Sequence, residues 1–148
     1  GLLDGAVDVV ATDHAPHTLE EKERPYASAP SGGPLVQHSL PMMLELSAQG
    51  VSPVETVVEK MCHAPARLFG VRDRGFLRTG HFADIVLVRP ADPWTVSKEN
   101  ILYKCGWSPL EGTAFSHRVV RTLVNGRTVY ADGRVDTAHR GAELEFDR

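Results

Sequence analysis

The sequence has few cysteines and no long apolar run. Its 148 residues include two cysteines, Cys62 and Cys105, which lie far apart and outside any CxxC arrangement. This usage suits a reducing compartment, which we expect to be the cytoplasm, better than a disulfide scaffold. No stretch approaches the roughly eighteen consecutive apolar residues that a membrane-spanning helix requires, so we expect no membrane partner.

A strong excess of charge is missing as well. The formal net charge is −3, which gives no reason to expect nucleic acid or an anionic surface as a partner. The chain has no signal-peptide pattern, and it begins at Gly1-Leu2-Leu3-Asp4 without a methionine. Such a start resembles a helix entered midway, so we expect a truncated chain. The length is still sufficient for one domain with a core of its own.

The first half of the chain predicts one strand, a long loop and two helices. The β-branched run at residues 7–11 is typical of a buried strand that ends at Asp13. Residues 18–34 carry a charge cluster and then several prolines and glycines, which indicates a loop. One helix is expected from near Pro34 to Gly50. A second is expected to open with a capping box in Ser52-Pro53-Val54-Glu55 and to end at Gly70.

The second half predicts a small β assembly. Residues 82–88 form an apolar strand, and the runs at 118–124 and 127–130 flank Asn125-Gly126, a strong hairpin signal. Residues 91–114 are rich in turn formers and predict an irregular excursion. We therefore divide the chain near residue 78. One strand and two helices cannot bury both faces of a layer, so the first half resembles the end of a larger α/β body.

The stretch ATDHAPH, residues 11–17, holds the first candidate for chemistry. Asp13 follows the predicted strand, and a carboxylate in that place can bind a divalent metal or act as a general base. Pro16 makes a regular helix unfavourable, so His17 is expected to project from a loop. Taken alone, an aspartate after a strand is more often a turn cap beside solvated histidines.

The wider context resembles one family. ATDHAPH resembles the second signature of the dihydroorotases, which belong to the cyclic amidohydrolase group of the amidohydrolase superfamily. Further stretches resemble the same family in the same order along the chain: residues 29–34 with 37–41, residues 64–70, residues 80–87, residues 107–112, and the hairpin around Asn125-Gly126. Together these stretches cover almost the whole chain.

This resemblance implies a fold and an activity. Residues 1–78 would be the terminal strand, substrate loop and helices of a TIM-type (β/α)8 metal-dependent hydrolase barrel. Residues 79–148 would form most of a small β-sandwich domain. The implied reaction is the reversible interconversion of dihydroorotate and N-carbamoyl-L-aspartate in pyrimidine biosynthesis.

The resemblance also implies roles for four residues. Asp13 matches the aspartate that ligates a metal and acts as general base, and His17 matches a residue that holds the substrate carboxylate. Ser31 and Gly32 match loop positions that meet the substrate, largely through backbone groups. Zinc is the implied metal, with two ions in the complete enzyme. The remaining ligands, a His-x-His pair, a carboxylated lysine and two more histidines, cannot be placed here, so we expect an N-terminal remainder to supply them.

Departures from the pattern leave alternatives open. Leu35 stands where the family has a second glycine, and Gln37 stands where it has a glutamate. The chain is therefore also compatible with a hydantoinase or allantoinase. A non-catalytic dihydroorotase-like subunit that supports aspartate transcarbamoylase is a further alternative, and a homo-oligomer is possible. Trp94 and Trp107 are interpreted as covers for the junction between the two halves.

Overall fold

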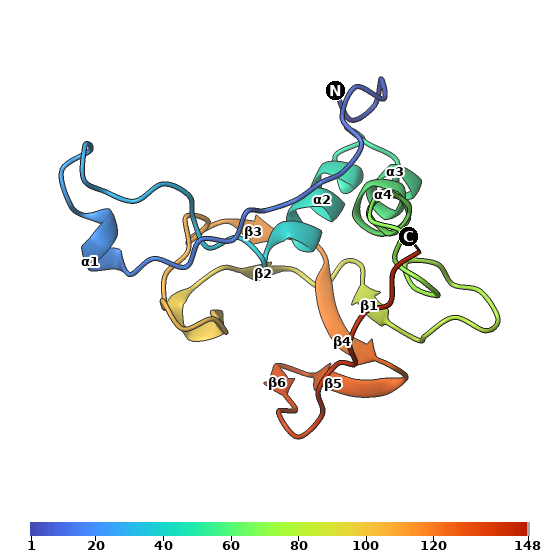
Figure 1. The fold of residues 1–148 in the computed structure, drawn as a ribbon. Coiled ribbons are helices and arrows are strands. Elements are labelled where there is room, and N and C mark those ends of the chain that lie inside the picture. Colours follow the sequence, from blue (N-terminus) through green and yellow to red (C-terminus); the bar gives the residue numbers. More distant parts are fainter. Residues whose placement is uncertain (148) are drawn as a thin grey trace.

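The computed structural model describes residues 1–147 and shows an extended N-terminal arm, a helical layer and a sheet (Figure 1). The helices are α1 (Leu19–Lys22), α2 (Ser39–Ala48), α3 (Val54–Val58), the π-helix η1 (Glu59–His63), α4 (Ala64–Leu68) and the 3-10 helix η2 (Lys98–Asn100). The strands are β1 (Ile85–Arg89), β2 (Trp94–Thr95), β3 (Ala114–Phe115), β4 (Arg118–Val124), β5 (Arg127–Ala131) and β6 (Arg134–Val135). The expected combination of helix and sheet is confirmed.

The two long helical segments lie where the sequence places them, with different starts. α2 begins at Ser39, several residues after Pro34, because the intervening residues form a turn in which His38 N–H bonds the Leu35 carbonyl at 3.0 Å. It ends at Ala48, and the φ of +74° at Gly50 lets Val51 N–H reach back to Leu46. The second segment runs through α3, η1 and α4 to Gly70. Its π-helical middle ends at His63, two residues before Pro65, which has no N–H to continue the regular bonding.

The predicted capping box at Ser52 is wrong. Pro53 is the N-cap of α3, and no side chain caps that end. The buried Ser52 hydroxyl instead lies 3.3 Å from the Pro53 carbonyl oxygen. A capping box does occur in α1, within the segment expected to be loop, where Thr18 and Glu21 bond each other's backbone N–H groups.

The predicted strand at residues 7–11 is also wrong. This segment is extended coil, held to the helical layer by Val10 N–H donating to Lys60 O at 3.0 Å and by Lys60 Nζ donating to Val7 O at 2.6 Å. A strand needs a neighbour for its ladder, and none of the strands within residues 1–147 pairs with it. Val10 packs at the edge of the small core formed by Met43, Leu44 and Val57.

The sheet follows the predicted hairpin. Four antiparallel strands are ordered β1-β4-β5-β6, and β2 pairs separately with β3 inside the excursion of residues 91–114. Asn125 and Gly126 have φ of +50° and +76°, as a tight hairpin turn between right-twisted strands requires. Val88 of β1 packs on the helical core, so the sheet and the helical layer are in contact. The boundary near residue 78 stays a prediction.

A buried arginine connects the helical layer to the sheet. Arg74 is 8% exposed, and its guanidinium contacts the Asp84 carboxylate and donates to Asn125 Oδ1 at 2.8 Å. Asp84 also accepts from Asn125 N–H at 2.8 Å, and the Phe82 ring lies 4.1 Å from the guanidinium carbon. Asp84 thus holds the hairpin turn against the start of β1.

Replacing Asp84 with alanine should destabilise the fold. The change leaves the buried Arg74 guanidinium without its charged partner, so the free energy of unfolding should fall by about 1–3 kcal/mol. Urea unfolding followed by circular dichroism measures the loss. The exposed Asp8 provides the matched control, and Asp8→Ala should leave the transition nearly unchanged. Equal effects of both variants would contradict the structural role of Asp84.

Glu45 gives the contact between α2 and the sheet a pH dependence. Its carboxylate accepts from the Ser116 hydroxyl at 2.7 Å and from Ser116 N–H at 2.8 Å. These bonds, the hydroxyl bond foremost, hold the pKa of Glu45 below its ordinary value of 4.5. A lowered pKa in the folded state stabilises the protein fully above the unfolded value, and this contribution is lost as pH falls through the folded pKa.

Glu45→Gln should therefore be less stable than the wild type at pH 7, and the difference should shrink as the pH falls below about 4.5. Urea midpoints at pH 7 and pH 3.5 for both proteins measure this difference. The other carboxylates with lowered pKa are common to both proteins and cancel in the comparison. A difference that stays constant over this range would contradict the assigned role of the ionised Glu45.

Candidate active site

Two loops that are separate in sequence lie side by side. We name residues 12–18 the Asp13 loop and residues 29–34 the Gly32 loop. Ala15 N–H donates to the Gly33 carbonyl at 3.1 Å and joins them. Gly32 has φ of +83°, and a Cβ built there would lie 2.7 Å from the Ala15 Cβ. Glycine is therefore required at position 32 by the backbone conformation and by the approach of the neighbouring loop.

Asp13 sits at the turn where the extended segment enters its loop. Its φ of +43° is unusual for a residue with a side chain, and such conformations are found preferentially at functional sites. The residue is exposed. Its carboxylate can therefore be reached by a substrate or by ligands from elsewhere.

The backbone of His17 is held from both sides, while its side chain stays half-exposed. Its N–H donates to Ala15 O at 2.9 Å, and its carbonyl accepts from Trp107 Nε1 at 2.8 Å. The imidazole Nδ1 lies 3.7 Å from the Glu21 carboxylate. The pKa of Glu21 is lowered, chiefly by the Thr18 N–H.

The neighbouring histidine, His14, is used internally. Its Nδ1 accepts a hydrogen bond from Val36 N–H at 3.2 Å, which places the ring proton of the neutral form on Nε2. The ring meets the edge of Tyr103 with centroids 5.4 Å apart. The two histidines of ATDHAPH are thus not equivalent: His14 holds the chain at Val36, just after the Gly32 loop, whereas the His17 ring remains accessible.

The Gly32 loop is also held from the charged segment. Lys22 Nζ donates to Pro30 O at 2.6 Å and to Gly32 O at 2.9 Å. The charge cluster after the Asp13 loop is therefore partly structural. Ser31 is exposed and adjoins this anchored stretch. The structure thus brings the predicted residues Asp13, His17, Ser31 and Gly32 into two joined loops.

His38 is fully buried at the start of α2. Its Nδ1 lies 3.3 Å from the Ser108 hydroxyl, and its ring packs among Trp94, Tyr103 and Phe115. Burial lowers the pKa of this imidazole below its ordinary value, so the neutral form is favoured. Because its side chain does not reach solvent, His38 serves packing and does not face a substrate.

Within the described residues, no set of potential metal-binding side chains gathers around Asp13. Within residues 1–147 there is no group of three or more His, Cys, Asp or Glu side chains placed to hold a metal ion. Nor does any helix of that range have the length and apolarity to cross a membrane. An exposed carboxylate is a fitting single ligand for a divalent cation, but a complete centre needs further ligands.

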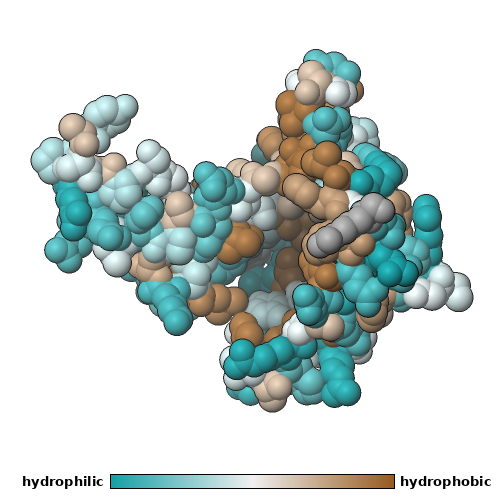
Figure 2. All heavy atoms as spheres, in the orientation of Figure 1, coloured by the Kyte–Doolittle hydropathy of each residue, from teal (hydrophilic) through white to brown (hydrophobic). Residues whose placement is uncertain are grey.

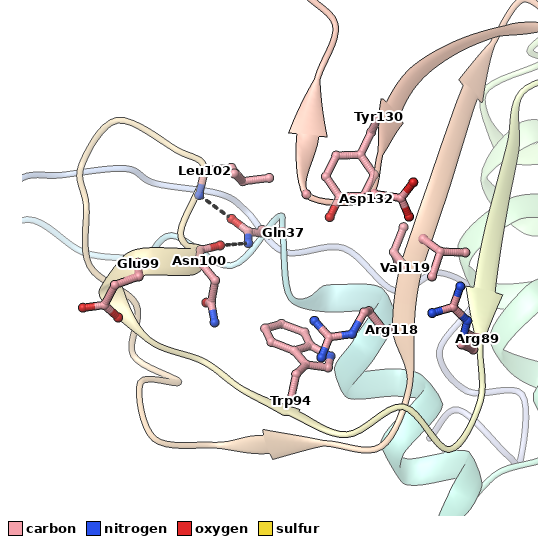
Figure 3. Close-up of a pocket in the computed structure, with 12 residues that line it drawn as sticks. Gln37, Arg89, Trp94, Glu99, Asn100, Leu102, Arg118, Val119, Tyr130 and Asp132 are labelled. Carbon is pink, nitrogen blue, oxygen red and sulfur yellow. Dashed lines mark hydrogen bonds between the residues drawn. The ribbon is translucent and has the colours of Figure 1, made fainter.

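A cavity of about 330 Å3 lies between the excursion and the sheet (Figure 3). It is separate from the two loops, since Asp13, His17 and Gly32 are not among its lining residues. Those residues are Gln37, Arg89, Trp94, Glu99, Asn100, Leu102, Arg118, Val119, Val120, Tyr130, Asp132 and Gly133.

Comparison with known proteins identifies the family. A dihydroorotase from Pelobacter propionicus is 41% identical over 130 residues, which is 88% of this chain and 30% of that protein. A dihydroorotase from Halobacterium salinarum is 40% identical over 143 residues, which is 97% of this chain and 33% of that protein. The chain belongs to the dihydroorotase family. It spans about 30% of the length of the relatives it matches, and no protein-family model matches it.

Solved structures place this dihydroorotase-family chain among the cyclic amidohydrolases. The L-hydantoinase (dihydropyrimidinase) from Arthrobacter aurescens superposes with a TM-score of 0.83 and 31% identity over 92% of this chain and 31% of that chain. The family is metal-dependent. The sequence reasoning missed Trp107 as part of the site, because it interpreted both tryptophans as junction covers. An indole N–H that leaves water needs an acceptor, but the sequence gives no local sign of which residue supplies it.

Replacing Gly32 with alanine tests the contact between the two loops. The left-handed φ and the collision with Ala15 should together lower the free energy of unfolding by about 1–3 kcal/mol. Ala15→Gly removes the colliding Cβ, so the double variant should recover the part of the loss that the collision causes. A double-mutant cycle from urea unfolding gives this term. Strict additivity of the two changes would contradict the close approach.

Proposed function

We propose that this chain is the C-terminal segment of a dihydroorotase, which interconverts dihydroorotate and N-carbamoyl-L-aspartate. The observation that carries the proposal is the joining of the Asp13 loop and the Gly32 loop, together with dihydroorotase relatives of up to 41% identity. The rest of the enzyme supplies the remaining metal ligands. The substrate is dihydroorotate, a small cyclic amide, and the enzyme works in the cytoplasm.

In this proposal Asp13 works as a metal ligand and a general base. Zinc is the proposed metal, with two ions in the complete centre, and when bound it polarises the amide carbonyl and makes water a stronger acid. Asp13 takes a proton from the water that attacks the ring carbonyl carbon. It delivers that proton to the nitrogen as the carbon–nitrogen bond breaks. In the direction of ring closure the same carboxylate acts in reverse.

The two loops supply substrate recognition. The accessible His17 ring pairs with the carboxylate of dihydroorotate, a group that distinguishes this substrate from hydantoin. Ser31 and Gly32 meet the flat ring through backbone groups, which can approach closely because position 32 has no side chain. The bonds from Lys22 and from Ala15 keep this stretch of main chain in place before the substrate arrives.

The surface of the chain supports a larger assembly. A compact protein of 16.2 kDa exposes about 7,500 Å2, whereas this chain exposes 9887 Å2. Apolar side chains reach the surface over the helices and around a hollow in the face shown in Figure 2. Exposed apolar side chains of the chain include Val54 and Val58 of the helical layer and Val86 and Leu87 of β1. We propose that the helical half closes a (β/α)8 barrel and that the sheet is one layer of a small β-sandwich.

The second candidate is a hydantoinase or dihydropyrimidinase, which the similarity to the Arthrobacter aurescens enzyme favours. A substrate panel of dihydroorotate, hydantoin and allantoin, assayed with the whole natural polypeptide, separates the two. Turnover of dihydroorotate alone supports the first candidate, and turnover of hydantoin overturns it. An absence of both turnover and bound zinc supports a non-catalytic subunit. Association with aspartate transcarbamoylase or a second copy stays a prediction, which the mass of the purified assembly tests.

Asp13→Ala should abolish turnover by the whole enzyme, with kcat at least about a thousandfold lower, since it removes a metal ligand and the base together. A dihydroorotate assay and the zinc content, measured on the same samples, report both losses. Asp8→Ala, which alters another exposed carboxylate of the same segment, is the matched control and should retain full activity. Substantial activity of the Asp13 variant would contradict the assignment.

A further inference from the structure

The excursion of residues 91–114 reaches both loops of the candidate site. Trp107 Nε1 donates to the His17 carbonyl at 2.8 Å, and Tyr103 OH donates to the Pro34 carbonyl at 3.0 Å. Both bonds are partly buried, and each ends on a backbone carbonyl of a different loop. Two aromatic side chains from one segment thus hold the two loops that carry the proposed substrate contacts.

The excursion is itself fixed to the start of α2. The Gln37 side chain donates to Asn100 O at 2.7 Å and accepts from Leu102 N–H at 2.8 Å, as Figure 3 shows. Ser108, the residue after Trp107, bonds the fully buried His38. The Trp107 indole therefore projects from a stretch that cannot shift without disturbing buried contacts, which makes it a rigid donor.

The chain that follows His17 is held by hydrogen bonds, among them the indole bond to His17 itself and the Lys22 bonds to the Gly32 loop. The next helix, α1, spans only Leu19–Lys22 and contains no buried residue. The segment after His17 therefore contributes little packing of its own. The indole bond ties this end of the Asp13 loop to the excursion, and the Lys22 bonds tie the segment after it to the Gly32 loop.

We propose that Trp107 is a positioning residue, whose indole N–H fixes the His17 backbone and so sets the place of the His17 imidazole relative to Asp13. This inference rests on the proposed function, because it assigns His17 to the substrate carboxylate. It also gives the neighbouring residues Trp107 and Ser108 distinct roles. Ser108 anchors the motif to buried His38, and Trp107 connects that anchor to the site.

Trp107→Phe tests the inference in the whole natural polypeptide that carries this chain. The variant keeps an aromatic ring and loses only the N–H donor. The KM for dihydroorotate should rise about 3- to 10-fold with little change in kcat, because one hydrogen bond that orders a binding group is lost. A merely structural role would lower the active fraction, and therefore kcat, at unchanged KM.

Trp94→Phe is the matched control. The Trp94 indole also donates to a backbone carbonyl, that of His117 at 2.8 Å, within the same excursion but away from the two loops. Its replacement by phenylalanine should leave KM unchanged. Equal KM effects from the two tryptophan variants would overturn the proposal.

A double variant separates action through His17 from action elsewhere. In a His17→Ala background the imidazole is gone, so Trp107→Phe should raise KM no further. The same fold-change in both backgrounds would overturn the inference. Amide hydrogen exchange of the peptide covering residues 13–22 provides a readout without turnover, and it should rise in Trp107→Phe but not in Trp94→Phe. If the wild type shows no dihydroorotate turnover, the proposed function fails, while unchanged exchange refutes the role of Trp107 separately.

Discussion

The hydrogen bond from Ala15 N–H to the Gly33 carbonyl is the contact on which the arrangement of the site depends. It joins two loops that belong to no sheet and to no long helix, so neither has a regular ladder to hold it. The bond forms only because the chain has no side chain at position 32, where an added Cβ would collide with Ala15. The bonds from Lys22 and from the excursion then hold the two loops in the arrangement that this close contact allows.

The excursion is irregular and yet well anchored. Its own regular structure is limited to η2 and the β2–β3 pair, and several of its side-chain bonds go to other parts of the chain. Binding and catalytic residues often lie on such irregular segments, which a rigid scaffold holds in place. A buried neutral histidine suits such a place, because its ring packs like an aromatic residue while one nitrogen still meets a hydroxyl.

The elements that the sequence predicted well are those whose signals are local. The hairpin at Asn125-Gly126 and the helix exits at Gly50 and Gly70 follow from backbone conformations that few residues adopt. The strand at residues 7–11 was wrong because a strand also needs a partner, and no local pattern states whether one is present in the chain. The family resemblance implied roles for residues of the Asp13 and Gly32 loops, and these roles stay predictions. The bond from Trp107 to His17 spans 90 residues of sequence and has no local signature.

The network around Arg74 also affects the chemical stability of the Asn125-Gly126 sequence. Asn-Gly sequences are chemically fragile, because the glycine nitrogen can attack the asparagine side chain and close a succinimide ring. Here the Gly126 N–H is bonded to Ala83 O at 3.0 Å, and the Asn125 side-chain oxygen is held by Arg74 at 2.8 Å. The attacking and receiving groups are thus both restrained by the contacts that fasten the hairpin to β1. We therefore expect the Asn125 side chain to deamidate more slowly in the folded protein than in the unfolded chain.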